Sequence, residues 1–255
     1  TMLTMDPPWH TRYRNTVAAY FTPRKIAELR PVIEEYVDSL LDKILENPNR
    51  TVEWVAEFAV PLPVIAIATI LGVSPDDMAD FKRWSDDNIS TIGSSVTDER
   101  RISATEGIVE MQHYFAERLE ARRNNHQGDF LSDLVNTEVD DGEGGKRTLH
   151  MPEMLSIISQ LLVAGNETTT NTFAEGMLYF GQDMSVWDKV RADRSLIAPA
   201  VEEMLRLASP SGGMFRVVTK DGVEIDGCPV KKGERVMVMY SAANRDPKVW
   251  GDDPD

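Results

Sequence analysis

The segment from Ala164 to Thr170, AGNETTT, combines residue types that can move protons with a sequence that suits a helix poorly. Glycine and threonine have low helix propensity, and a buried carboxylate is costly to desolvate. Because apolar residues before this segment predict a buried helix, we expect the Thr168 hydroxyl to bond the Ala164 carbonyl and the helix to open into a groove beside Gly165. Glu167 and Thr168 would then be an acid and an alcohol that relay protons into a closed site. A structural kink with a salt-bridged acid explains the same residues equally well.

Three cationic or hydrogen-bond-donating side chains suit an anionic ligand. His10 and Arg14 are four residues apart and therefore share one face of a predicted helix. Arg216 stands at the start of a predicted strand region. The alternatives are an ordinary solvated helix face for the first two residues and an ordinary strand-edge charge for the third.

Glu203 and Arg206 are three residues apart, a spacing that allows an ion pair within a helix. Exposed pairs of this kind contribute up to about 0.5 kcal/mol, so we expect a structural contribution and no chemistry. Further along, Asn244-Arg245-Asp246-Pro247 is typical of a turn.

The elements that must position these residues are mostly helical. The apolar period and the capping signals predict helices over residues 6–20, 31–46, 63–71, 75–88, 99–123 and 152–182, and a helix pair that ends at Ser209-Pro210. In the second helix, the residues expected to face the core are Ile33, Val37, Leu40, Leu41 and Ile44. In the fifth helix, they are Ile102, Ile108, Met111, Phe115 and Leu119.

Strand patterns occur near the end of the chain. Apolar residues alternate over 215–219, 223–225 and 236–240, with turns at Asp221-Gly222 and Lys232-Gly233. Residues 140–145 read as a solvated loop or hairpin tip. The fold class is therefore mainly α with a small β-sheet. We find no repeat and no linker, which favours a single domain over residues 1–255.

Composition limits the functions that remain open. With 27 Lys and Arg against 42 Asp and Glu, the formal charge of −15 argues against nucleic acid and anionic membranes as partners. The apolar stretch over residues 58–73 is interrupted by Pro61 and Pro63 and is too short to cross a bilayer, and no secretory signal is evident. The single Cys228 excludes an internal disulfide and multi-cysteine metal sites, and it fits a reducing cytoplasm.

Taken in order, these segments resemble the cytochrome P450 family, in particular its soluble bacterial members. His10, Arg14 and the following Phe21-Thr22-Pro23-Arg24 resemble the entry to that family's C helix. AGNETT at residues 164–169 resembles its oxygen-binding helix, Glu203-x-x-Arg206 its K-helix pair, and residues 243–247 the segment that follows its small sheet. Each motif is weak to moderate alone, whereas four in the right order are strong.

The resemblance implies a haem b cofactor and a role for each motif. His10, Arg14 and Arg216 match positions that bind haem propionates, and Ala164 and Gly165 would lie over the distal face of the haem. Glu167 and Thr168 match the pair that delivers protons to dioxygen, and the Glu203 and Arg206 pair has a structural role. The resemblance also implies a hydrophobic small-molecule substrate and electrons from NAD(P)H through a ferredoxin or similar donor.

The sequence departs from the family pattern at the haem ligand. In the family, a cysteine thiolate binds the iron from a glycine-rich loop downstream of the Asn-Arg-Asp-Pro segment, so we expect that cysteine beyond residue 255. Cys228 precedes that segment and reads as a strand or turn residue. We therefore expect a fragment that lacks both ends of the domain, does not bind haem through a thiolate and is inactive alone.

Two alternatives stay open at this stage. The chain is either a monooxygenase fragment or a non-catalytic, all-helical binding or regulatory module, and within the enzyme fold a peroxide-using member is the second choice. The acid and alcohol pair argues against peroxide use, because peroxide already carries its protons. The substrate is expected to contact residues 75–123, where Trp84, Ile89 and Ile92 suggest only a hydrophobic compound.

Overall fold

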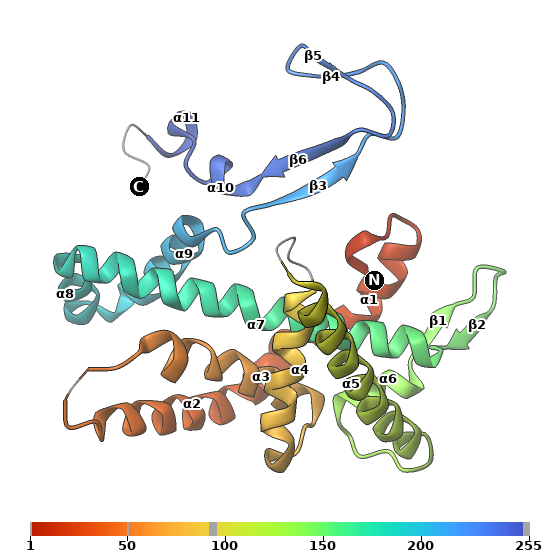
Figure 1. The fold of residues 1–255 in the computed structure, drawn as a ribbon, viewed down its shortest axis with the longest axis horizontal. Helices are drawn as coiled ribbons and strands as arrows, with labels where there is room; N and C mark the ends of the chain where they lie inside the picture. Colours follow the sequence, from red (N-terminus) through yellow and green to blue (C-terminus); the bar gives the residue numbers. More distant parts are fainter. Residues whose placement is uncertain (1, 50, 92–95, 252–255) are drawn as a thin grey trace. The chain divides into compact units, whose positions relative to one another are not determined.

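The computed structural model describes residues 2–49, 51–91 and 96–251 (Figure 1). The chain divides into two compact units, residues 1–167 and 168–255, which are described separately below. The long helix α7, Met151–Gln182, crosses the boundary between them. Helices dominate and the strands are short, so the expected fold class, mainly α with small β-sheets, is confirmed.

The first unit begins with a short 3₁₀ turn, Met2–Thr4, and helix α1, Trp9–Ala18. We expected α1 to start at the two prolines, but it starts directly after them. The residue before a proline is disfavoured in helical geometry, which keeps Pro7 out of the helix because Pro8 follows it. Tyr13 and Val17 are buried and attach α1 to the core.

Helix α2, Pro23–Leu45, begins eight residues before the predicted start at Pro31. Thr22 caps it by accepting a hydrogen bond from the Lys25 amide, and Pro23 fits the first turn, where its missing N–H has no intrahelical partner. Pro31 therefore lies inside the helix. The predicted apolar face of α2 is half-buried, except for Leu41, which is exposed.

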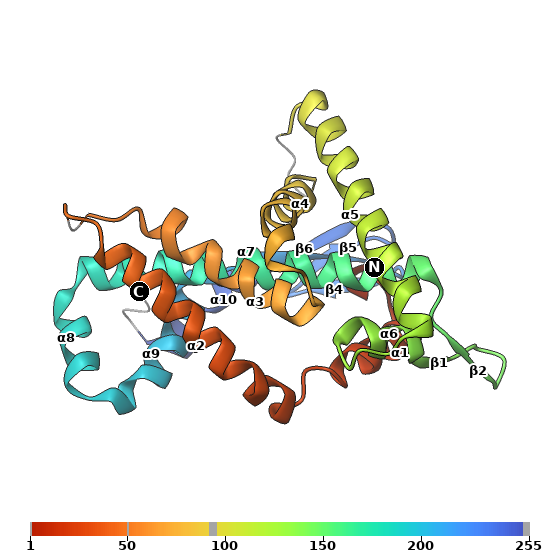
Figure 2. The ribbon, with the colours of Figure 1, turned by 90° about the horizontal axis from the view of Figure 1, so that it is seen from below.

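A turn of π-helix, Val55–Ala59, leads into helix α3, Pro61–Leu71, which ends at Gly72 in the left-handed conformation. A 3₁₀ turn, Pro75–Asp77, precedes helix α4, Met78–Ser90, and helix α5 spans Asp98–Asn124. Helices α4 and α5 pack side by side (Figures 1 and 2). Three predicted helices therefore form within three residues of their expected bounds.

Helix α5 buries a regular stripe that includes Met111, Phe115 and Leu119, as expected, and Ile108 is half-buried. Ile102 was expected to face inward, but it is 62% exposed. Its place near the start of α5 is taken by Ala104 and Gly107, whose small size allows α4 to approach closely. The core of this unit continues through α3, α4, the short helix α6 and the first half of α7.

Helix α6, Phe130–Asn136, was not predicted. Asp129 caps it by accepting from the Ser132 amide at 2.8 Å, and four of its seven residues are buried hydrophobics. Strands β1, Glu138–Asp140, and β2, Lys146–Thr148, then form an antiparallel hairpin whose tip contains the predicted solvated loop. The hairpin leads directly into α7 (Figure 2).

The second unit contains the end of α7, helix α8, Met184–Ala192, a 3₁₀ turn, Arg194–Leu196, and helix α9, Ile197–Ala208. Two antiparallel ribbons follow: β3, Gly213–Val217, pairs with β6, Arg235–Met239, and β4, Val223–Ile225, pairs with β5, Cys228–Val230. The predicted turns contain Gly222 and Gly233, both at positive φ. Tyr240, predicted to end a strand, starts the short helix α10, Tyr240–Ala243, which precedes α11, Pro247–Trp250.

Among the described residues, none of the helices combines the length and the apolar character that crossing a bilayer would require.

Candidate functional site

The segment that the sequence singled out lies in the middle of α7, and the helix is continuous through it. The expectation that the helix opens beside Gly165 is therefore wrong. A threonine hydroxyl can bond a carbonyl four residues back while the backbone ladder stays intact, and Thr172 does this with the Thr168 carbonyl at 2.9 Å. A threonine-rich sequence therefore does not require an interrupted helix.

Consecutive residues of α7 point in different directions, which gives the segment a packed side and an open side. A Cβ atom at Gly165 would lie 2.5 Å from Ile67 Cδ1, so the glycine allows α3 to approach closely. Asn166 is buried and donates to Ser85 Oγ of α4 at 2.5 Å. Ala164 and Glu167 are exposed. The helix therefore packs through Gly165 and Asn166 and leaves Ala164 and Glu167 on the open side.

Thr168 lies four residues after Ala164, so helical spacing places it on the same face of α7 as Ala164 and beside Glu167. Thr168 is half-buried. Thr168 and Ala164 thus lie on the side opposite Asn166, and the exposed Glu167 leaves the helix about 100° from Asn166. This arrangement leaves a carboxyl and a hydroxyl accessible to a small molecule bound against that face.

His10 and Arg14 lie on α1, as predicted. His10 is half-buried and Arg14 is exposed. Among the described residues, neither side chain forms a hydrogen bond or an ion pair, whereas Arg12 on the same helix contacts Asp140 at 3.4 Å. Two donor groups on one helix are therefore available to an anionic ligand.

Arg216 lies on β3 in the second unit and is exposed. Its guanidinium donates to the Phe215 carbonyl at 3.0 Å and to the Tyr240 hydroxyl at 3.4 Å. Both partners are neutral, and no carboxylate within the described part of the chain pairs with it. Its positive charge thus remains uncompensated.

Glu203 and Arg206 form a two-pronged ion pair within α9, with contacts of 2.6 and 2.8 Å. The hydrogen bonds from Arg206 lower the pKa of Glu203. Arg206 also donates to the Asn244 carbonyl at 2.6 Å and lies over the Trp250 ring. These contacts tie α9 to the chain that follows β6, which is a structural task.

Sequence reasoning missed a second cluster in this unit. Arg245 donates to the Leu207 carbonyl at 2.7 Å and to the Tyr179 hydroxyl at 3.1 Å. Arg245 therefore connects the turn after α10 to both α9 and the end of α7. The arginine in a turn motif was the available signal, but its partners are about 40 and 70 residues away along the chain and have no motif of their own.

Sequence reasoning also missed a network in the first unit. The Glu153 carboxylate receives two hydrogen bonds from Arg147, both at 2.7 Å, one from the His150 amide at 2.7 Å, and one from the Tyr13 hydroxyl. Burial raises the pKa of Glu153, but the bonds from Arg147 and Tyr13 outweigh it and hold the pKa at about 2. For Tyr13, burial and the neighbouring carboxylate raise the pKa. Glu153 therefore joins α1, the β1–β2 hairpin and the start of α7.

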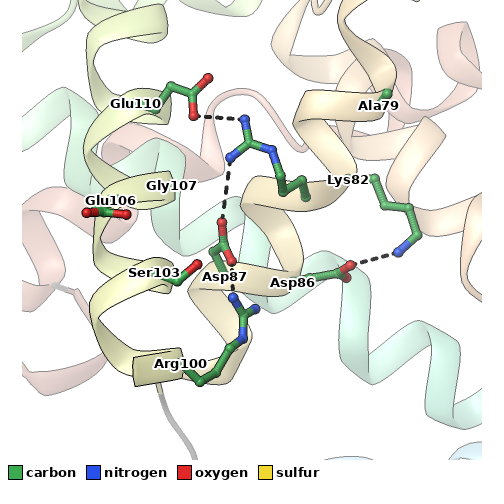
Figure 3. Close-up of a pocket in the computed structure, with 10 residues that line it drawn as sticks. Ala79, Lys82, Asp86, Asp87, Arg100, Ser103, Glu106, Gly107 and Glu110 are labelled. Atoms are coloured by element: carbon green, nitrogen blue, oxygen red, sulfur yellow. Dashed lines mark hydrogen bonds and ion pairs between the residues drawn. The ribbon is translucent and has the colours of Figure 1, made fainter. Parts of the chain in front are cut away.

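A pocket of about 450 Å³ lies between α4 and α5, and charged side chains line it (Figure 3). Asp87 points into the interface, where Arg100 contacts it at 2.7 Å and Arg83 at 3.9 Å. Gly107 faces Asp87 so closely that a Cβ would lie 1.9 Å from its Oδ2. Two ion pairs of this lining join the helices, Arg100 with Asp87 and Arg83 with Glu110 at 2.8 Å. The charged lining differs from the apolar lining expected for a hydrophobic substrate.

The residues expected to contact substrate have different environments. Trp84 belongs to the buried core, where its ring centroid lies 4.9 Å from that of Tyr114. It is therefore not available to a ligand. Ile89 is half-buried. Ile92 lies outside the described residues.

The described residues contain no group of three or more His, Cys, Asp or Glu side chains able to hold a metal ion. Cys228 is exposed at the start of β5, a strand position as expected.

Comparisons with known proteins support the family resemblance that the order of the motifs indicated. The cytochrome P450 family model matches residues 1–255, and the chain therefore belongs to the cytochrome P450 family. It is 35% identical over 98% of its length to cytochrome P450 monooxygenase PikC of Streptomyces venezuelae, and 36% identical over 99% to nocardicin C N-oxygenase of Nocardia uniformis subsp. tsuyamanensis. It covers 58% and 61% of these two proteins.

Solved structures give the same result. A crystal structure of P450BioI in complex with an acyl carrier protein matches all of this chain with a TM-score of 0.89 and 32% identity. The structure of CYP109Q5 from Chondromyces apiculatus matches with a TM-score of 0.87 and 36% identity. The chain covers 63% and 61% of those structures, so it spans about three fifths of the length of its relatives.

Membership of this family implies a haem, and the residues present fit that group in part. A haem carries two anionic propionates, and His10, Arg14 and Arg216 have no acidic partner among the described residues despite the net charge of −15. The face of α7 that carries Ala164 and Glu167 is exposed, and α3 and α4 pack on the side of Gly165 and Asn166. The donor set is therefore suitable for the propionates, whereas Cys228 in its exposed hairpin is not placed as an iron ligand.

Proposed function

We propose that the chain is the central part of a single cytochrome P450 domain in a longer, haem-dependent monooxygenase. The reaction is R–H + O₂ + 2e⁻ + 2H⁺ → R–OH + H₂O, with electrons from NAD(P)H through a ferredoxin or similar donor. The observation that carries this proposal is the open side of α7, where Ala164 and Thr168 lie opposite the packed Asn166 and the Glu167 side chain is exposed. The monooxygenase names of the relatives support it.

Each residue then has a defined task. The haem b supplies the centre at which dioxygen is bound and reduced. Glu167 would take up protons from solvent, and Thr168 would donate them from its hydroxyl toward dioxygen, so that one oxygen atom leaves as water. His10, Arg14 and Arg216 would hold the propionates, and Ala164 on the open face of α7 would form the wall beside the oxygen site. Gly165, which was expected to share that wall, serves the packing of α3 instead.

The cysteine ligand is proposed to come from a part of the longer protein outside residues 1–255. Support comes from the greater length of the relatives and from the exposed position of Cys228. The Glu203 and Arg206 pair keeps α9 in place. The single cysteine and the NAD(P)H-linked electron supply fit a cytoplasmic enzyme.

The substrate is proposed to be a hydrophobic small molecule. Two relatives are named steroid C26-monooxygenase and polyketide biosynthesis cytochrome P450 PksS, and the steroid in the first name is an apolar kind of compound. Neither name selects one compound class for this chain.

The test uses the full-length parent protein. We expect its reduced, carbon monoxide-bound form to show the red-shifted Soret band of thiolate-ligated haem, and a panel of steroids, fatty acids and polyketides to include a compound that shifts the ferric spectrum. A full-length protein that folds in the presence of haem and lacks the red-shifted band would contradict the proposal. A protein of that kind would be a non-catalytic binding module.

A further inference from the structure

Like Asp129, the Glu153 carboxylate receives four hydrogen bonds from within the first unit. It lies in the first turn of α7 and receives bonds from a strand arginine, a backbone amide and a tyrosine of α1. Both Arg147 contacts are 2.7 Å and use different guanidinium nitrogens, which fixes the plane of the carboxylate as well as its position. The acceptor presented to Tyr13 is therefore rigid.

Tyr13 is placed so that its bond to Glu153 controls the rotation of α1. It is three residues after His10 and directly before Arg14, so the three side chains leave the helix axis within about 100° of one another. A tether at Tyr13 therefore fixes the directions in which His10 and Arg14 point. Because α1 has only ten residues, few other contacts can replace this one.

The other attachments of α1 are less specific. Val17 is buried among apolar side chains, and such packing restrains position without fixing a bond direction. Arg12 reaches Asp140 at 3.4 Å, but Asp140 is 66% exposed, and exposed ion pairs contribute little. The Tyr13 bond is directional and part-buried, and it ends on a carboxylate that Arg147 already holds in place.

We infer that Tyr13, Glu153 and Arg147 form a positioning network that sets the rotation of α1, so that His10 and Arg14 meet the haem propionates. This inference rests on the proposed function. None of the three residues is proposed to touch the haem, and their effect passes through His10 and Arg14.

The experiment measures how fast ferric haem leaves the full-length holoprotein for excess apomyoglobin, which requires no turnover. Loss of a single hydrogen bond changes a rate or equilibrium constant about two- to tenfold. We therefore expect Tyr13→Phe to release haem about three- to tenfold faster. Glu153→Gln keeps the side-chain shape but removes the charge, and we expect an effect of about tenfold or more. The red-shifted Soret band of the reduced, carbon monoxide-bound form should remain.

Tyr20→Phe is the matched control. Tyr20 lies just beyond the end of α1, and its half-buried hydroxyl bonds Thr137 Oγ1 at 2.7 Å, so the variant also loses one tyrosine hydrogen bond. We expect both tyrosine variants to lower the thermal midpoint similarly, while Tyr20→Phe changes haem release less than about twofold. Equal acceleration by the two variants would show a general stability effect and overturn the inference.

A double-variant comparison tests whether Tyr13 acts through its neighbours. In a protein that already carries His10→Phe and Arg14→Ala, adding Tyr13→Phe should no longer accelerate haem release. A full, additive effect in that background would also overturn the inference. Failure of the proposed function can be told apart from failure of this inference. If the proposed function is wrong, the wild-type protein already lacks the spectrum of thiolate-ligated haem, before any variant is compared.

Discussion

Asn166 donates a hydrogen bond from Nδ2 to the Ser85 hydroxyl at 2.5 Å, although 81 positions separate the two residues in the chain. Both are buried, and they join α7 to α4 within the first unit. Apolar contacts tolerate small slips between helices, whereas a buried hydrogen bond requires one geometry. Asn166 immediately precedes Glu167, so this bond also defines the direction of the proposed acid.

Ser85→Ala should therefore lower the free energy of unfolding of the parent protein by about 1–2 kcal/mol, because a buried acceptor is removed without a substitute. Denaturant unfolding of the holoprotein measures the change. Ser90→Ala is the control on the same helix, since the Ser90 hydroxyl bonds the Asp87 carbonyl of α4 itself. Equal losses for the two variants would show that the contact with α7 contributes nothing specific.

Gly107→Ala should destabilise the protein although alanine favours helices. The new Cβ would lie 1.9 Å from Asp87 Oδ2, and Asp87 cannot turn away without losing its 2.7 Å contact with Arg100. Overpacking of this kind costs about 1–3 kcal/mol, whereas the helix-propensity gain is at most about 1 kcal/mol, so the expected net effect is a loss of up to about 2 kcal/mol.

Gly181→Ala provides the control, because Gly181 also lies in a helix, α7, and apart from the adjacent helix backbone and its chain neighbours no described atom comes within 4 Å of the position that its Cβ would occupy. We expect a stabilisation of up to about 1 kcal/mol, measured by the same denaturant titration. A neutral or stabilising Gly107→Ala would mean that α4 and α5 separate more easily than their ion pairs indicate.

Glu153 should contribute to acid stability. Its pKa in the folded protein is about 2, below the ordinary value of 4.5, so its stabilisation is fully present above pH 4.5 and is lost as the pH falls toward 2. The shift corresponds to a stabilisation on the order of 3 kcal/mol at neutral pH. Glu153→Gln should therefore lower stability at pH 7 and flatten its decline between pH 4.5 and 2.

Denaturant midpoints of wild type and Glu153→Gln, measured from about pH 2 to 7, test this prediction. Glu110→Gln serves as the control, because Glu110 also pairs with an arginine, Arg83, but is more than half exposed. Parallel pH curves for wild type and Glu153→Gln would refute the assignment of the low pKa to Glu153.

The sequence predicted most long helices because their apolar period and their caps are local features. It placed the start of α2 at Pro31 because a proline normally begins a helix, whereas the Thr22 cap and Pro23 start it earlier. It missed α6, whose seven residues are too few for a period to be recognised. The opening of α7 was a wrong prediction, because the side chains of α3 and α4 that pack against Gly165 and Asn166 are not visible in a single segment.

In the candidate site, too, local features were predictable from the sequence and long-range contacts were not. The Glu203 and Arg206 ion pair was predicted correctly because the two residues are spaced by one helical turn. Glu167 and Thr168 stay a prediction, made from one contiguous motif. The Tyr13 and Glu153 contact joins residues 140 positions apart, and neither has a local signature. Contacts at such separation depend on tertiary packing, which a single sequence does not reveal.

Thr168→Ala should divert electrons from product to hydrogen peroxide in the full-length enzyme. Without the hydroxyl, delivery of the proton that lets one oxygen leave as water becomes slower, and the competing reaction O₂ + 2e⁻ + 2H⁺ → H₂O₂ gains. Loss of a positioned proton donor costs about 10²-fold or more in the step it serves, so peroxide should become the main two-electron product. Product and peroxide are measured per NAD(P)H consumed.

Thr169→Ala is the control, since Thr169 follows directly but leaves the helix about 100° away from Thr168. Its product yield should stay close to that of wild type. Glu167→Gln should slow turnover and increase its sensitivity to heavy water, because protons would reach Thr168 only through solvent. If Thr168→Ala keeps the wild-type ratio of product to peroxide, the alcohol on the open face of α7 has no part in proton delivery, and the face itself serves only to contact the substrate.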